Sequence, residues 1–137
     1  MKNYSFFKKE IFDKEPKLRT YQIKNLNDYF EKKKKYVLKI DPRIKGLKDY
    51  KKFKVFSVDG EKIRDNLDMD FVMGGNGSRY LYIPMNEIWI EGVYVKTPEL
   101  KFILLHEYTE LKLMEKGYNY CKAHDTASAK ELRIRRK

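Results

Sequence analysis

The order of the predicted elements indicates an α+β fold. A helical segment lies near the start of the chain, alternating segments typical of strands occupy its middle, and two helical segments close it. Because short turn signals separate the strand segments, we expect a small antiparallel sheet. A short turn also joins the last two helices, so we expect these to be antiparallel.

The N-terminal helix is predicted over residues 21–36. Apolar side chains recur there at helical spacing: Ile23, Leu26, Tyr29 and Phe30. Four lysines at 32–35 fall in its last turn, where cations suit the negative end of the helix dipole. Asp41-Pro42 and Gly46 then interrupt the pattern.

Four segments are predicted as strands: 53–58, 69–73, 79–83 and 87–95. Asp59-Gly60 has the form of a hairpin turn. Gly74-Gly75-Asn76-Gly77 also predicts a turn, and no Lys-Ser/Thr pair follows it as in a phosphate-binding loop. Pro84 and Gly92 bracket residues 88–91, which we therefore expect at or near the edge of the sheet.

The last two helices have clear boundary signals. Thr97-Pro98-Glu99 offers an N-cap, a proline and an acid for the first turn of one helix, and Gly117 is suited to end it. The next helix is predicted over about 119–135. Its small residues, Ala123, Ala127 and Ala129, would let a neighbouring helix approach closely.

Length and composition indicate one domain with an intracellular location. The chain has 137 residues, and we expect a basic helical segment (1–54) packed on the same domain as a sheet and two-helix core (55–137). No apolar run is long enough to span a membrane, and the N-terminus lacks a signal-like apolar core. The single cysteine, Cys121, excludes an intrachain disulfide. We therefore expect a cytoplasmic protein that is neither secreted nor membrane-bound.

Charge is unevenly distributed along the chain. The formal net charge is +11; residues 1–54 hold 18 Lys/Arg and 7 Asp/Glu, whereas residues 55–137 hold 13 of each. A basic front of this kind is typical of proteins that contact nucleic acid. It is equally typical of a small lysine-rich protein kept soluble by its charge.

The segment His106-Glu107-Tyr108-Thr109-Glu110 carries the main chemical signal. At 100° per residue, Glu110 lies about 40° and Glu107 about 100° from His106 on the helix. The apolar residues of the same helix occupy this arc too: Leu100, Phe102, Ile103, Leu111, Leu113 and Met114. Ionisable groups on a core-facing arc are costly without compensation. A divalent cation can compensate them, because it binds neutral imidazole and carboxylate together.

The last helix can complete this arrangement. His124 and Glu131 share one face of it with Tyr120 and Ser128. In an antiparallel pair, His124 can reach the side of His106 and Glu110. The sequence therefore predicts a divalent-cation site with ligands His106, Glu110 and His124 and an open fourth position, the form that catalytic zinc sites take.

His106-Glu107-x-x-Glu110 resembles the HExxH helix of zincin-type metallopeptidases, with glutamate in place of the second histidine. The wider pattern over about 55–135 resembles short phage and viral proteins; it includes Asp70-Phe71, Gly74-Gly75-Asn76, Glu87-Ile88-Trp89-Ile90 and Ala123-His124. The resemblance implies a zinc-dependent peptidase that acts on an extended polypeptide held by strand 87–91. It implies that Glu107 is the general base and that Tyr120 and Glu131 support the ligands. The glutamate ligand is also compatible with iron or manganese.

Three alternatives to a hydrolase follow from the same residues. His106 and Glu110 can form a buried hydrogen-bonded pair without metal, with His124 on the surface beside Asp125 or Glu131. The chain can be a non-catalytic nucleic-acid-binding accessory protein that uses residues 1–54. Its metal site can also be purely structural, with Glu131 as a fourth ligand.

Overall fold

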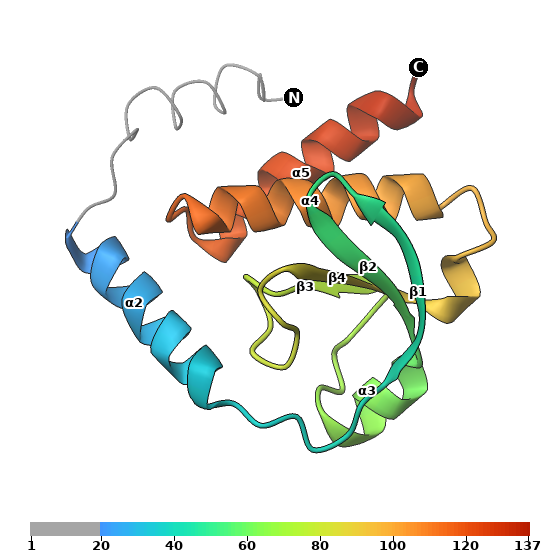
Figure 1. Cartoon of the computed structure of the whole chain (residues 1–137). Helices are drawn as coiled ribbons and strands as arrows, with labels where there is room; N and C mark the ends of the chain where they lie inside the picture. Colours follow the sequence, from blue (N-terminus) through green and yellow to red (C-terminus); the bar gives the residue numbers. More distant parts are fainter. Residues whose placement is uncertain (1–19) are drawn as a thin grey trace.

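The computed structural model describes the backbone of residues 20–137 and the side chains from residue 26 onward. It is an α+β fold, as predicted (Figure 1). The elements are, in order, α2 (Thr20–Lys35), β1 (Arg43–Tyr50), β2 (Phe53–Val58), α3 (Gly60–Asn66), β3 (Gly74–Asn76), β4 (Glu87–Glu91), a 3-10 turn (Gly92–Tyr94), α4 (Leu100–Glu115) and α5 (Tyr120–Arg135).

The sheet is mixed, which corrects the expectation of a purely antiparallel one. Its strand order is β1-β2-β4-β3; β1 and β3 are antiparallel to their neighbours, whereas β2 and β4 run parallel. The reason lies at Asp59-Gly60, which is not a hairpin turn. The Asp59 side chain accepts a hydrogen bond from the Lys62 backbone N–H at 3.0 Å and caps α3. The chain therefore crosses over before it enters β4.

Two predicted strands are wrong, and two observed strands, β1 and β3, were not predicted. Residues 69–73 and 79–83 form turns and irregular segments, although they bury Phe71 and Ile83 completely. Their apolar residues fill the core without forming strand pairs. The prediction was wrong because it rested on hydrophobicity alone, which does not require a strand. β1 lacks a regular alternation of apolar and polar residues, so it was not predicted as a strand. It lies within the segment 1–54. That segment is not helical throughout, and the boundary expected at residue 54 falls inside β2.

The glycine-rich stretch at 74–76 is an edge strand and not a turn. A Cβ on Gly74 would lie 2.9 Å from Ile103 Cγ2 and 3.0 Å from the Trp89 carbonyl oxygen. A Cβ on Gly75 would lie 2.9 Å from both Ile83 and Tyr80. Glycine is needed here because β3 lies so close to its neighbours that a side chain would not fit. In the sequence, the same glycines indicate a turn.

Alternate residues of the central strands pack on opposite faces of the sheet. Ile88 and Ile90 of β4, with Val55 of β2, pack against Ile103 and Leu111 of α4. The other face packs against α3 and the loops around it through a second cluster: Val58, Ile63, Phe71, Tyr82, Ile83 and Trp89. Helix α5 packs on α4 (Figure 1).

The three long helices agree with the sequence within a few residues. α2 and α5 match their predicted spans to within one residue. Gly117 directly follows the C-cap of α4, as expected, and has a φ of 97°. α4 begins at Leu100, two residues later than expected, because Thr97 closes a preceding turn in which its hydroxyl oxygen accepts from the Glu99 N–H at 3.2 Å. Within residues 20–137, no helix has both the length and the apolar character needed to cross a membrane.

Candidate metal centre

Helix α4 presents its carboxylates to the interior, as the helical spacing predicted. Glu107 and Glu110 are 8% and 3% exposed, and Leu111 beside them is fully buried. The apolar residues of the helix pack on the sheet and fix its rotation. The two carboxylates are therefore held in the interior by the packing of their neighbours.

Helix α5 brings His124 over these groups. Ala123 and Ala127 are fully buried, so the α5 backbone lies close to α4. The helices run antiparallel: Glu99 pairs with Arg135 at one end, while Glu110 meets His124 nearer the other. The side chain of His124 is 44% exposed and that of His106 only 13%. The cluster thus has a buried side and an open side.

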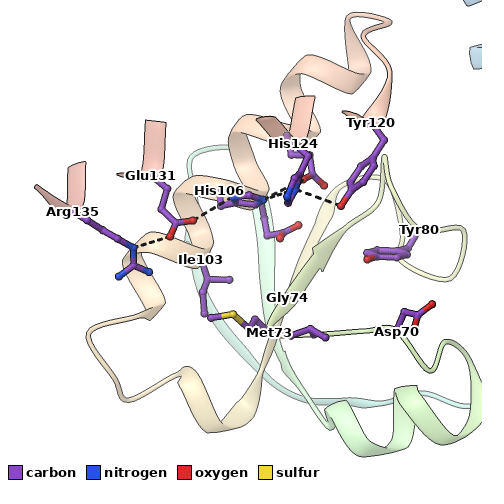
Figure 2. A pocket seen from close by; sticks show the side chains of 13 residues that line it. Asp70, Met73, Gly74, Tyr80, Ile103, His106, Tyr120, His124, Glu131 and Arg135 are labelled. Atoms are coloured by element: carbon purple, nitrogen blue, oxygen red, sulfur yellow. Dashed lines mark hydrogen bonds and ion pairs between the residues drawn. The ribbon is translucent and has the colours of Figure 1, made fainter. Parts of the chain in front are cut away.

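Three ligand atoms converge at one point. His106 Nε2 is 3.2 Å from His124 Nδ1 and 3.2 Å from Glu110 Oε2, and His124 Nδ1 is 3.1 Å from the same oxygen (Figure 2). His106, Glu110 and His124 are therefore brought together as the sequence predicted, and each offers one atom that can bind a metal ion. Although the side chain of His124 is 44% exposed, its Nδ1 faces Glu110 and His106.

The spacing of these atoms fits a small divalent cation. Ligands at about 2.0–2.1 Å from a tetrahedral zinc ion lie about 3.3–3.4 Å apart, close to the three separations above. Two imidazole nitrogens and one carboxylate oxygen are also ligands that zinc accepts. A simple His106–Glu110 pair would not require a second imidazole at the same point, so the third group favours a cation site over the pair.

Asn76 is a site residue whose role was not predicted: the sequence indicated only a turn at this position and a place in the wider pattern of the resemblance. Its side-chain amide donates to Glu107 Oε1 at 3.0 Å and to Glu110 Oε1 at 3.3 Å. Its Oδ1 accepts from the backbone N–H groups of Ser78 and Arg79, which fixes the amide with its NH₂ toward the carboxylates. The side chain is completely buried. The sequence signal for this role was an asparagine next to two glycines. Turns often have the same residues, so the signal did not distinguish the two.

Glu107 lies in a setting that favours its protonated form. Burial, and then the nearby Glu110 carboxylate, raise the pKa of Glu107 to about 8, although His106 and the Asn76 amide act in the opposite direction. A carboxyl with a pKa near neutrality suits a group that must both accept and release a proton.

The pKa of His106 is also raised. Burial lowers the pKa of this imidazole, but the hydrogen bond to Glu110 and the charges of Glu107, Glu110 and Glu131 together outweigh burial. The cluster therefore has a negative potential that attracts either protons or a metal cation.

Glu131 contacts the far side of the His106 ring. Its Oε1 is 3.3 Å from His106 Nδ1, close enough for an ion pair but not aligned as a hydrogen bond. Arg135 holds Glu131, because its Nε donates to Oε2 at 2.7 Å. A carboxylate at Nδ1 orients an imidazole whose Nε2 binds a metal. Glu131 thus supports His106, and it is poorly placed as a fourth ligand on the Nε2 side.

Tyr120 lies at the open side of the cluster. Its hydroxyl is 3.4 Å from His124 Nδ1, and the Arg79 guanidinium carbon lies 4.0 Å from the centre of its ring. Burial is the main cause of a raised pKa for Tyr120, so the phenol keeps its proton at neutral pH. The O–H group is therefore a hydrogen-bond donor near the ligand atoms.

A cavity of about 300 Å³ opens beside the three ligand atoms (Figure 2). The catalytic and supporting candidates, Glu107, Tyr120 and Glu131, all line it, with Met73, Gly74 and Ile103.

The strand nearest to the cavity is β3, which lies at the sheet edge, whereas β4 is paired on both sides. Residues 87–91 are therefore near the edge but not free to pair with a peptide, which corrects the strand role implied by the resemblance.

No protein-family model, curated protein or solved structure matches the chain.

Proposed function

We propose that the chain is a metal-dependent hydrolase, of the zincin type, that cleaves a polypeptide. The observation that carries the proposal is the triangle of His106 Nε2, His124 Nδ1 and Glu110 Oε2, with edges of 3.1–3.2 Å, beside a cavity. These residues would hold a divalent cation, zinc first. Such an ion, when bound by three protein ligands, supplies Lewis acidity and lowers the pKa of a water molecule.

The chain's own residues have separable roles in this proposal. Glu107 lines the cavity next to the ligands, and its raised pKa suits a general base that later returns the proton to the leaving amine. Tyr120 offers an O–H donor to the oxygen on which negative charge develops. Asn76 holds Glu107 and Glu110 in place by donating to both carboxylates.

The shape of the cavity wall supports an extended polypeptide as the substrate. Gly74 of β3 lines the cavity, and the outer side of β3 has no further strand in the described sheet. All three residues of β3 are buried, so a peptide would have to reach this edge from the cavity to pair with its backbone. Met73 and Ile103 beside Gly74 offer an apolar surface for a substrate side chain.

A purely structural metal site is less well supported. It would need a fourth protein ligand, and Glu131, the expected one, faces Nδ1 of His106 rather than Nε2. The nucleic-acid-binding alternative rests on the basic front. Residues 1–19 of that front lie outside the described residues.

The first test is metal binding by protein purified without an affinity tag. We expect about one zinc per chain by elemental analysis, and zinc at a hundredfold excess over Kd should stabilise the fold by about 2.7 kcal/mol. Glu110→Gln and His124→Ala should each abolish both effects, whereas the exposed control Glu115→Gln should not. Wild-type protein without bound metal or a zinc-dependent melting shift would overturn the proposal.

The second test separates metal binding from catalysis. Glu107→Gln should keep zinc but lose at least 100-fold in the cleavage rate of a quenched fluorescent peptide library. A Glu107→Gln variant that cleaves as fast as wild type would contradict the role of Glu107 as the base.

A further inference from the structure

The β1–β2 hairpin carries a concentration of unpaired positive charge. Residues 43–54 contain six Lys/Arg and one acidic residue, Asp49. Arg43 is bound by Asp41 and Glu87. The five lysines, Lys45, Lys48, Lys51, Lys52 and Lys54, are all exposed. Among the described residues, no carboxylate is recorded within ion-pair distance of any of these five lysines.

Protection of a sheet edge explains only part of this charge. Lysines on an edge strand oppose pairing with other chains, and β1 is an edge strand. Lys51 and Lys52, however, lie in the turn, and Lys54 lies on β2, which is paired on both sides. The neighbouring Glu87 does not balance Lys54, because Arg43 and the Trp89 indole N–H already bind that carboxylate.

The hairpin turn is held against α4 by aromatic rings. The ring centroid of Tyr108 on α4 lies 5.5 Å from that of Tyr50 and 5.8 Å from that of Phe53. The ammonium of Lys51 lies 5.8 Å and 5.3 Å from the ring centres of Tyr50 and Tyr108. These contacts hold the turn of the hairpin against α4, over which it lies in Figure 1. The lysines of the turn therefore have a defined position relative to α4.

A groove of about 420 Å³ lies between the hairpin and the start of α4. Leu47, Val55, Leu100 and Leu104 provide apolar walls. Tyr50, two lysines (Lys48 and Lys51) and one acidic residue, Asp49, line it as well. Helical spacing places Lys101 and Lys112 on the same side of α4 as Tyr108, roughly opposite His106. The groove and its lysines therefore face away from the metal centre.

We propose that this surface, formed by Lys48, Tyr50, Lys51, Lys52 and Tyr108 and here called the hairpin surface, binds single-stranded nucleic acid. Lysines neutralise backbone phosphates, while aromatic and apolar side chains accept unpaired bases, a combination typical of single-strand binding. A duplex would offer the phosphates but would keep its bases stacked away from the groove. The inference does not depend on the proposed hydrolase function.

The experiment measures binding of a fluorescent 12-nucleotide single strand by anisotropy at several salt concentrations. With about four phosphate contacts, the affinity should fall about 50-fold between 50 and 200 mM salt. The triple variant Lys48→Glu, Lys51→Glu, Lys52→Glu should lose at least tenfold in affinity at 50 mM salt. The control triple variant Lys62→Glu, Lys96→Glu, Lys116→Glu has the same net charge, and it should lose less than threefold. Thermal melting of both variants checks that they fold.

The outcomes separate the location of binding from net charge. Equal losses in the two triple variants would mean that the overall charge of +11 is responsible, and would overturn the assignment. An equal loss in Lys32→Glu, Lys34→Glu, Lys35→Glu would place binding on α2 and would also overturn it. So would tighter binding of a duplex, tighter binding of phosphatidylserine vesicles, or no binding of the single strand at 50 mM salt.

Discussion

The candidate metal centre, for brevity called the metal centre below, and the hairpin surface both use ionisable side chains, but their charges have opposite surroundings. In the metal centre, groups of both signs lie within about 3 Å of one another and are largely buried. On the hairpin surface, charges of one sign stand apart in water without carboxylate partners among the described residues. In the first arrangement, the stability of the fold depends on every partner being present, because a buried charge without its partner is costly. The second contributes less to the stability of the fold, through the contacts of Lys51 with Tyr50 and Tyr108, and it leaves the other lysines free to bind a partner.

The strongest test of this difference is Asn76→Ala. The substitution removes both donors to Glu107 and Glu110 and leaves the Ser78 and Arg79 N–H groups without their acceptor. We expect the free energy of unfolding to fall by about 3 kcal/mol, as for buried groups left unsatisfied. Urea denaturation of the metal-free protein measures it. The exposed Asn86→Ala is the control, and a loss below about 1 kcal/mol in Asn76→Ala would break the comparison.

The metal-free protein should become less stable as pH rises from 5 to 7. Glu107 has a raised pKa in the folded state, about 8 against 4.5 unfolded, so its contribution is full below pH 4.5 and is lost as pH rises toward 8. His106, whose folded pKa is also raised, acts in the same direction. We expect a loss of about 2 kcal/mol over this interval.

Urea titrations in EDTA at pH 5, 6 and 7 give this slope. The interval avoids Asp41 and Glu99, whose lowered pKa values cost stability only in acid. Lys33, whose pKa burial lowers to about 7, titrates only at the upper end of the interval, where it acts in the opposite direction. Glu107→Gln should flatten the profile. Stability that increases with pH in the metal-free wild type would contradict the assignment of Glu107 as a buried acid.

Glu131→Gln tests whether the metal centre extends beyond its three ligands. The substitution removes the charge 3.3 Å from His106 Nδ1 and weakens the contact with Arg135. We expect about a tenfold loss of zinc affinity by competition with a chelating dye, as for other carboxylates that orient a ligand histidine. The exposed Glu115→Gln is the matched control. Unchanged affinity would confine the site to His106, Glu110 and His124.

The smallest effect is expected on the hairpin surface. The Lys48→Glu, Lys51→Glu, Lys52→Glu variant should unfold within about 0.5 kcal/mol per substitution of wild type, since these side chains are exposed. Urea denaturation at pH 7 measures the difference. A loss above about 3 kcal/mol would show that these lysines are structural, and the contrast with Asn76 would disappear.

Periodicity in the sequence was sufficient for the long helices and for the burial of Glu107 and Glu110. Side chains three and four residues apart share a face whatever surrounds the helix, so the apolar arc of α4 fixed which carboxylates turn inward. Gly117 marked the end of α4 for the same local reason, whereas the capping signal at Thr97 placed the start of that helix two residues too early. The convergence of His124 on His106 followed from a short turn between two helices.

Tertiary structure alone decided the sheet and the rest of the site. Gly74-Gly75 forms a strand because of what lies beside it, namely Ile103, Ile83 and Tyr80. Asp59, in contrast, begins a helix through a local contact with the Lys62 N–H. Asn76 acquires its role only when β3 lies against α4. Local spacing sets the faces of a helix, but strand partners and buried polar contacts join residues far apart in the chain, and no pattern within one segment encodes them.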